Sequence, residues 1–184
     1  MRTLRALISA SALAALVCAA GPSCKSAEDP KPEITGEIKI EGPPAKELCE
    51  AYLKIQTTLA DDKLDDLPQL SARVVAATGL LGGEDVGLDR VLAGAGRTAA
   101  EDISTARLGF KKMSDGMIAY LQAHPEHREG LEIIHCPMAF NNQGADWVQR
   151  KGDILNPYHG KMMLHCGDHV PWPETPKAAP PPAG

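Results

Sequence analysis

The chain is poor in aromatic residues and carries no excess of positive charge. Phe, Trp and Tyr make up 4% of its 184 residues, although 43% are hydrophobic, so the composition predicts one modest core rather than two. The formal net charge is -5. Proteins that bind nucleic acid hold the phosphate backbone with a basic face, so this balance argues against a nucleic-acid partner.

The sequence also lacks the usual signatures of catalysis. Residues 94–98 contain two glycines, but they follow no expected strand and lack the Gly-Lys-Ser/Thr ending of a phosphate-binding loop. The acidic run at residues 61–66 lacks the glycine and the closing glutamate of a calcium loop. No Ser-His-Asp or Cys-His pairing follows from the order of the residues alone. We therefore expect a protein that is not an enzyme.

A long apolar run occurs only at the N-terminus. Two arginines precede an Ala/Leu-rich stretch that ends at Ala20 and is too short to span a bilayer stably, which is typical of a secretory signal. Two processing routes stay open: cleavage after a small residue such as Ala20, or cleavage before Cys24 with lipid attached to its thiol. We expect a periplasmic or otherwise extracytoplasmic protein, which touches the membrane only if Cys24 carries lipid.

Composition along the rest of the chain predicts one domain between two unstructured ends. Proline and charge dominate the segment after the signal, and proline and alanine dominate the C-terminus. The predicted organisation is a signal peptide at 1–23, a flexible tether at 24–44, a helical domain at 45–170 and a disordered tail at 171–184.

Hydrophobic periodicity predicts a mainly α fold. Apolar side chains recur every three or four residues in three stretches, as in amphipathic helices. These helices are expected over residues 45–61, 64–81 and 99–124, with a short helical turn in the glycine-rich stretch 82–98. Two short apolar runs, 131–136 and 161–166, are expected to pair as strands. The predicted architecture is a bundle of three or four helices with a small C-terminal β-hairpin or irregular cap.

Soft metal donors concentrate in the last third of the chain. All six histidines follow residue 123, as do Cys136 and Cys166. Cys49 lies outside this cluster, beside the apolar stripe of the first helix, and is expected to be a half-buried thiol with no assigned role. Thiolate and thioether sulfur favour Cu(I), and imidazole serves copper, zinc and nickel. The inventory predicts binding of copper as Cu(I), or of another soft heavy-metal ion, rather than of magnesium or calcium.

The geometry of a β-strand narrows the choice of metal ligands. Residues two apart on a strand share a face, so Cys136 and Met138 would face one ion if the extended backbone continues past residue 137, while His135 would point away. Met163 and Cys166 are three apart and would reach one site from a turn. The expected ligands are therefore Cys136, Met138, Met163 and Cys166, with His165 and His159 in reserve.

A disulfide between Cys136 and Cys166 is the alternative. Exported thiols tend to pair, and this bridge would close a loop of about thirty residues, worth about 3–4 kcal/mol in a chain-entropy model. The protein would then be a disulfide-stapled module that docks on an efflux adaptor or another envelope protein without binding metal.

His124 and His127 flank a proline at a helix end, where the helix dipole favours a protonated imidazole. We interpret these two histidines as structural, with weak metal capture as the alternative.

The C-terminal half carries an ordered set of anchors: Cys136-Pro-Met-Ala139, Gly144 with Trp147, Asn156-Pro-Tyr158, Gly160, Met163 and Cys166-Gly167. In this order they resemble an uncharacterised bacterial extracytoplasmic domain family, found alone or fused to copper and heavy-metal efflux adaptors. The similarity spans about residues 45 to 170. It implies a small helical domain linked with periplasmic heavy-metal handling, with an efflux adaptor as partner. Its Cys/Met motif transfers to Cys136, Met138, Met163 and Cys166, and the other anchors are read as scaffold.

Overall fold

The computed structural model describes residues 38–82 and 85–174. The predicted signal peptide, Cys24, most of the tether and residues 175–184 of the predicted tail lie outside the described residues. Within the described ranges, no helix is long and apolar enough to cross a membrane. The four long helices are α1 (Pro44–Ala60), α2 (Leu67–Leu81), α3 (Leu88–Thr98) and α4 (Ile103–Ala123).

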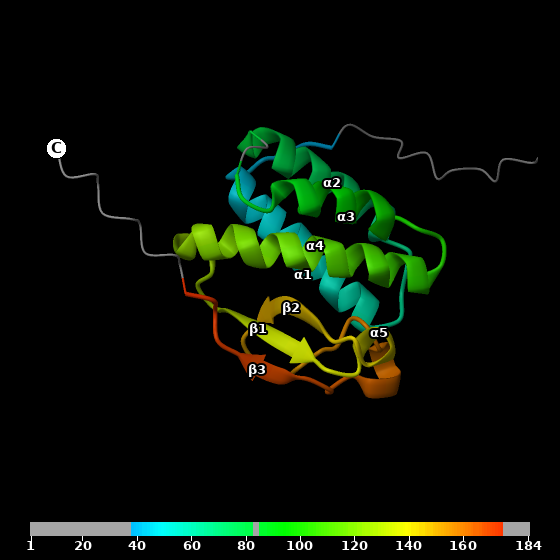
Figure 1. Ribbon diagram of the computed structural model, residues 1–184. Helices are drawn as coiled ribbons and strands as arrows, with labels where there is room; N and C mark the ends of the chain where they lie inside the picture. The colour runs from blue at the N-terminus through cyan, green and yellow to red at the C-terminus, as the bar shows by residue number, and fades with distance from the viewer. Residues whose placement is uncertain (1–37, 83–84, 175–184) are drawn as a thin grey trace, which may run out of the picture. The chain divides into compact units, whose positions relative to one another are not determined.

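The C-terminal part forms a small antiparallel sheet. Its strands are β1 (Leu131–Cys136), β2 (Ala145–Arg150) and β3 (Asp168–Val170), in the order β2-β1-β3. Figure 1 shows the long helices on one side and the three strands on the other, with α4 packed against β2. The predicted mainly α fold with a small C-terminal β cap is confirmed. Three short helical elements complete the order: η1 (Pro125–His127) lies between α4 and β1, α5 (Ala139–Asn142) between β1 and β2, and η2 (Gly160–Met163) between β2 and β3.

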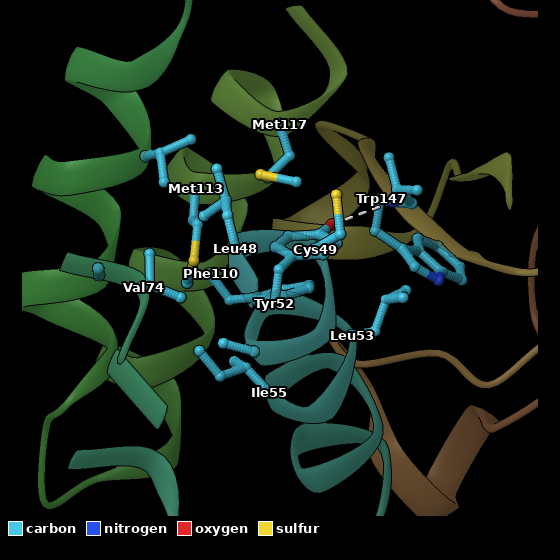
Figure 2. Close-up of a cluster of buried hydrophobic side chains, with 14 of the residues drawn as sticks. Leu48, Cys49, Tyr52, Leu53, Ile55, Val74, Phe110, Met113, Met117 and Trp147 are labelled. Carbon is cyan, nitrogen blue, oxygen red and sulfur yellow. Dashed lines mark hydrogen bonds between the residues drawn. The ribbon is translucent and has the colours of Figure 1, made fainter. Parts of the chain in front are cut away.

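The core lies where α1 and α4 meet the sheet. Tyr52 stacks on Phe110 with ring centroids 5.0 Å apart. Its buried hydroxyl lies 2.8 Å from Ser114 Oγ and accepts the backbone N–H of Val148 at 3.0 Å, so it ties both long helices to β2. Figure 2 shows Met117 in the same cluster, and both core methionines predicted on α4, Met113 and Met117, are fully buried.

The glycine-rich stretch forms a longer helix than the sequence predicted. Instead of a short turn, residues 88–98 make three turns of helix packed along α4. Gly94 explains the difference, because a Cβ there would lie 2.4 Å from the backbone nitrogen of Met113. A Cβ at Gly116 would lie 2.6 Å from the backbone oxygen of Gly87. These glycines allow the two helices to approach closely, rather than breaking them.

The predicted strand at 131–136 is confirmed, but its predicted partner is wrong. Residues 160–163 form the 3₁₀ helix η2, and β1 pairs instead with β2 and β3. In η2 the backbone of Gly160 has a φ of +59°, and a Cβ there would lie 1.9 Å from the carboxylate of Asp62. An extended backbone is therefore replaced by a tight turn that packs against the end of α1.

Candidate metal centre

Cys136 is the last residue of β1 and pairs with Ala145 across the hairpin. Its side chain is fully buried. The preceding residue, His135, is half exposed, and its Nδ1 lies 2.6 Å from Asp146 Oδ1 on the neighbouring strand. The strand alternation predicted from sequence therefore holds at this point: Cys136 faces the core and His135 faces away.

Cys166 follows η2 in a turn that Asn156 holds in place. The backbone N–H of Cys166 donates to Met163 O at 3.0 Å, and Asn156 Nδ2 donates to Cys166 O at 2.7 Å. Asn156 is fully buried, and its Oδ1 accepts the backbone N–H groups of Tyr158 at 2.8 Å and His159 at 3.1 Å. One amide side chain thus fixes both ends of the segment that presents Cys166.

The same segment is anchored to the helices by polar contacts. Arg107 on α4 donates from Nε to Pro157 O at 2.9 Å and from a terminal nitrogen to Asp62 Oδ1 at 2.6 Å. Asp62, just after α1, also accepts the backbone N–H of Lys161 at 3.0 Å. Gln56 on α1 donates to Leu155 O at 2.5 Å. The position of Cys166 is therefore set by the helical layer as well as by its own turn.

These two supports bring the thiols of Cys136 and Cys166 together from segments thirty positions apart. Their Sγ atoms lie 3.6 Å apart as free thiols. Two sulfurs that share one tetrahedral ion at Zn–S bond lengths are separated by about 3.8 Å, whereas disulfide sulfurs are about 2.05 Å apart. The separation is close to that of two ligands of one tetrahedral ion, and it is also that of two free thiols in contact.

Burial and the neighbouring Cys136 thiol raise the pKa of the Cys166 thiol above its ordinary value, and Asp168 contributes in the same direction. A raised pKa disfavours the thiolate, which is the nucleophilic form of cysteine. The thiolate is also the form that binds metal, so metal binding at this pair would have to release the thiol protons.

The two methionines occupy different positions around this pair. Met163 is half buried in the turn that leads to Cys166. The expectation that Met138 shares a strand face with Cys136 is wrong, because β1 ends at Cys136 and Met138 has helical backbone angles at the start of α5. Its side chain is 46% exposed. Of the two methionines, Met163 is the one whose backbone carbonyl accepts a hydrogen bond from a cysteine of the pair.

The two reserve histidines differ in their surroundings. His165 is exposed, and its Nδ1 lies 2.8 Å from Ile154 O. Nε2 of His159 is buried and has no hydrogen-bond partner in the described chain. Over residues 38–82 and 85–174, no histidine or carboxylate joins Cys136 and Cys166 in a group of three close ligand atoms. Among the described residues, the pair thus consists of two sulfur atoms with no close histidine or carboxylate ligand atom.

Cys49 differs from the sequence expectation, since it is buried rather than half buried. It lies on α1, and burial raises the pKa of its thiol to about 11. Cys49 contacts the core, whereas Cys136 and Cys166 contact each other. Cys49 is therefore a buried thiol outside the Cys136–Cys166 pair.

Sequence reasoning missed Asp146 and Glu126, and it interpreted His124 and His127 as structural, with weak metal capture as the alternative. Asp146 was not singled out, although strand alternation beside Trp147 places it opposite His135. A group of His124, Glu126 and His127 also has ligand atoms within 4.8 Å of one another. Its signal in the sequence was the three-residue spacing of two histidines around a proline, which a 3₁₀ turn brings to one side.

Comparison with protein-family models, with curated proteins and with solved structures finds no match to this chain. The resemblance of the residues 136–167 to an extracytoplasmic family therefore stays a prediction.

Proposed function

We propose that this protein binds a soft heavy-metal ion, Cu(I) in the first instance, outside the cytoplasm and either buffers it or delivers it to an efflux system. The observation that carries the proposal is the 3.6 Å separation of Cys136 and Cys166 Sγ. Two thiolates at this spacing form a soft, polarisable pair of donors, which favours Cu(I) over hard ions.

Burial supports a site that holds its ion while leaving a route for exchange. Cys136 is fully buried and Cys166 is half buried, so the pair is reached from the Cys166 side. Met163, in the same turn as Cys166, would add a third soft ligand. A site with few sulfur ligands and one open side suits transfer of the ion to another protein.

The second candidate is a disulfide-stapled module that docks on an efflux adaptor or another envelope protein. The same sulfur contact favours it, because an oxidant would need to draw the two atoms only about 1.5 Å closer. In this state Cys136 and Cys166 would lock the segment after β2 onto β1. The two candidates predict opposite chemistry for the same pair of thiols, so one protein preparation distinguishes them.

A competition titration with a chromogenic Cu(I) chelator under anaerobic, reducing conditions tests metal binding. The full chain carries Cys18→Ser and Cys24→Ser, so that the thiols of the N-terminal segment do not contribute. One equivalent of Cu(I) should bind, and the Cys136→Ala, Cys166→Ala double variant should lose it. Alanine is chosen because it leaves no unpaired hydroxyl at the buried Cys136 site.

Cys49→Ala in the same background is the matched control, since it removes a buried thiol outside the pair. It should keep the full equivalent of Cu(I). Unchanged stoichiometry in the double variant would refute the proposal. Thiol counting on protein isolated from an oxidising compartment tests the second candidate: a Cys136–Cys166 bridge that resists mild reductant, with no Cu(I) uptake after full reduction, would establish the staple instead.

A further inference from the structure

A second group of potential metal ligands lies at the far end of α4, where the chain enters η1. His124 is the C-cap residue directly after α4, and Pro125 begins the 3₁₀ turn that carries Glu126 and His127. The backbone N–H of His127 donates to His124 O at 3.0 Å and closes this turn. Because side chains three residues apart eclipse in a 3₁₀ turn, both imidazoles come to one side.

The ligand atoms in this group are close enough to share one ion. Glu126 Oε1 lies 3.4 Å from His124 Nδ1 and 3.8 Å from His127 Nε2. In a tetrahedral zinc site with bonds of 2.0–2.1 Å, neighbouring ligand atoms are about 3.4 Å apart. The carboxylate thus sits between the two imidazoles at nearly the spacing that coordination requires.

The surroundings hold the two rings in place. Tyr120 is buried, and its ring lies against both imidazoles, with centroids 4.6 Å from His124 and 6.2 Å from His127. The other ring nitrogen of His124, Nε2, lies 3.4 Å from Asp85 Oδ1. Metal-binding histidines commonly give their second N–H to a carboxylate, which fixes the tautomer and the ring orientation. Asp85 stands where that partner belongs, on the opposite side of the ring from Glu126.

We propose that His124, Glu126 and His127 form a separate binding site for a borderline divalent cation of the Zn²⁺ class, with Asp85 orienting His124. Two imidazoles and one carboxylate are harder donors than the Cys136–Cys166 pair, so the two sites select different ions. His124 is partly buried, whereas Glu126 and His127 are exposed, which leaves room for water to complete the coordination. This site stands on its own geometry and does not depend on Cu(I) binding elsewhere.

A salt bridge is the competing interpretation of these contacts. Exposed ion pairs contribute little to stability, with a median of about 0–1 kcal/mol. They also require no second carboxylate behind the imidazole and no aromatic wall against both rings. His169 provides a comparison within the same protein, since its Nδ1 lies 3.1 Å from Glu132 Oε2 as a simple surface pair without another imidazole.

Calorimetric titration with Zn²⁺ tests the site. The full chain carries serine at positions 18 and 24 and alanine at 136 and 166, which removes Zn²⁺ binding by these thiols. One equivalent should bind, and a His124→Gln, His127→Gln double variant should bind about tenfold more weakly or worse. His169→Gln is the matched control and should bind as tightly as its parent. Equal affinity in the double variant, or absence of Zn²⁺ binding in the parent, would overturn the proposal.

Two further measurements keep the test independent of any folding defect. Asp85→Asn leaves all three ligands in place and should weaken Zn²⁺ binding by about tenfold, the usual effect of losing an orienting carboxylate. NMR of the imidazole resonances in the otherwise unaltered full chain should show Zn²⁺ shifting His124 and His127 while His169 stays in place. Shifts confined to His169, or no imidazole shifts at saturating Zn²⁺, would contradict the assignment.

Discussion

Replacing Asn156 by alanine should both destabilise the protein and displace Cys166. The side chain is fully buried and makes three hydrogen bonds, to the backbone groups of Tyr158, His159 and Cys166. Alanine leaves two N–H groups and one carbonyl without these partners. At about 1–3 kcal/mol for each buried polar group left unsatisfied, with water reaching the more open ones, the free energy of unfolding should fall by about 3–5 kcal/mol.

Urea unfolding followed by the fluorescence of buried Trp147 measures this change. Gln143→Ala is the control, because it removes an exposed amide nearby and should change the free energy by less than about 0.5 kcal/mol. Because Asn156 holds the turn that presents Cys166, the Asn156→Ala variant should also bind Cu(I) more weakly at temperatures where it is still folded. If the free energy of unfolding falls by less than about 1 kcal/mol, the net value of a single hydrogen bond, the reasoning is refuted.

Two other predictions concern the helical layer. Gly94→Ala should lower the free energy of unfolding by about 1–3 kcal/mol in urea titrations, because the new Cβ meets the backbone of α4. Gly96→Ala, two residues further along α3, adds a Cβ with no atom within 4 Å and should raise the free energy of unfolding by about 0.5–1 kcal/mol. Equal effects of the two substitutions would contradict the packing argument. The backbone N–H of Lys161, and secondarily Arg107, lowers the pKa of Asp62, so its contribution is present above about pH 4 and is lost on acidification. Asp62→Asn should therefore lower the free energy of unfolding at neutral pH, by less than about 1 kcal/mol because this group is partly exposed. In acid the difference in stability between the variant and the wild type should become smaller. A difference that stays constant across pH would contradict this prediction.

The helices were predictable because their signal is local. Leu48, Tyr52, Ile55 and Leu59 recur at helical spacing and are all fully buried on α1. α3 was underestimated because glycine lowers helix propensity, while its benefit at Gly94 appears only when α4 lies against it. A contact between distant segments cannot be read from the propensity of either one.

The pairing of the strands was not predictable for a related reason. The run from Lys161 to Cys166 has the apolar texture of a strand, but the positive φ of Gly160 and the contacts of Asp62 fold it into a turn. β2, in contrast, alternates poorly and includes the buried polar residue Gln149, which bonds to Trp147 Nε1. Here tertiary hydrogen bonds override local pattern.

The sequence identified the candidate ligands by residue type, but only the structure shows which of them lie together. Clustering of sulfur in the sequence pointed to Cys136 and Cys166, whose sulfurs lie in contact. It also pointed to Met138, which the end of β1 turns towards solvent. The period-two rule applies only while the strand continues, and the sequence did not reveal that it ends at residue 136.

X-ray absorption at the copper edge tests the central claim most directly. The sample is the reduced full chain with serine at positions 18 and 24, loaded anaerobically with one equivalent of Cu(I). If Cys136 and Cys166 share the ion, the nearest scatterers are sulfur, and Cys136→Ala with Cys166→Ala abolishes that sulfur shell. Only nitrogen and oxygen neighbours in the parent protein, or a sulfur shell that survives in the double variant, would contradict the account.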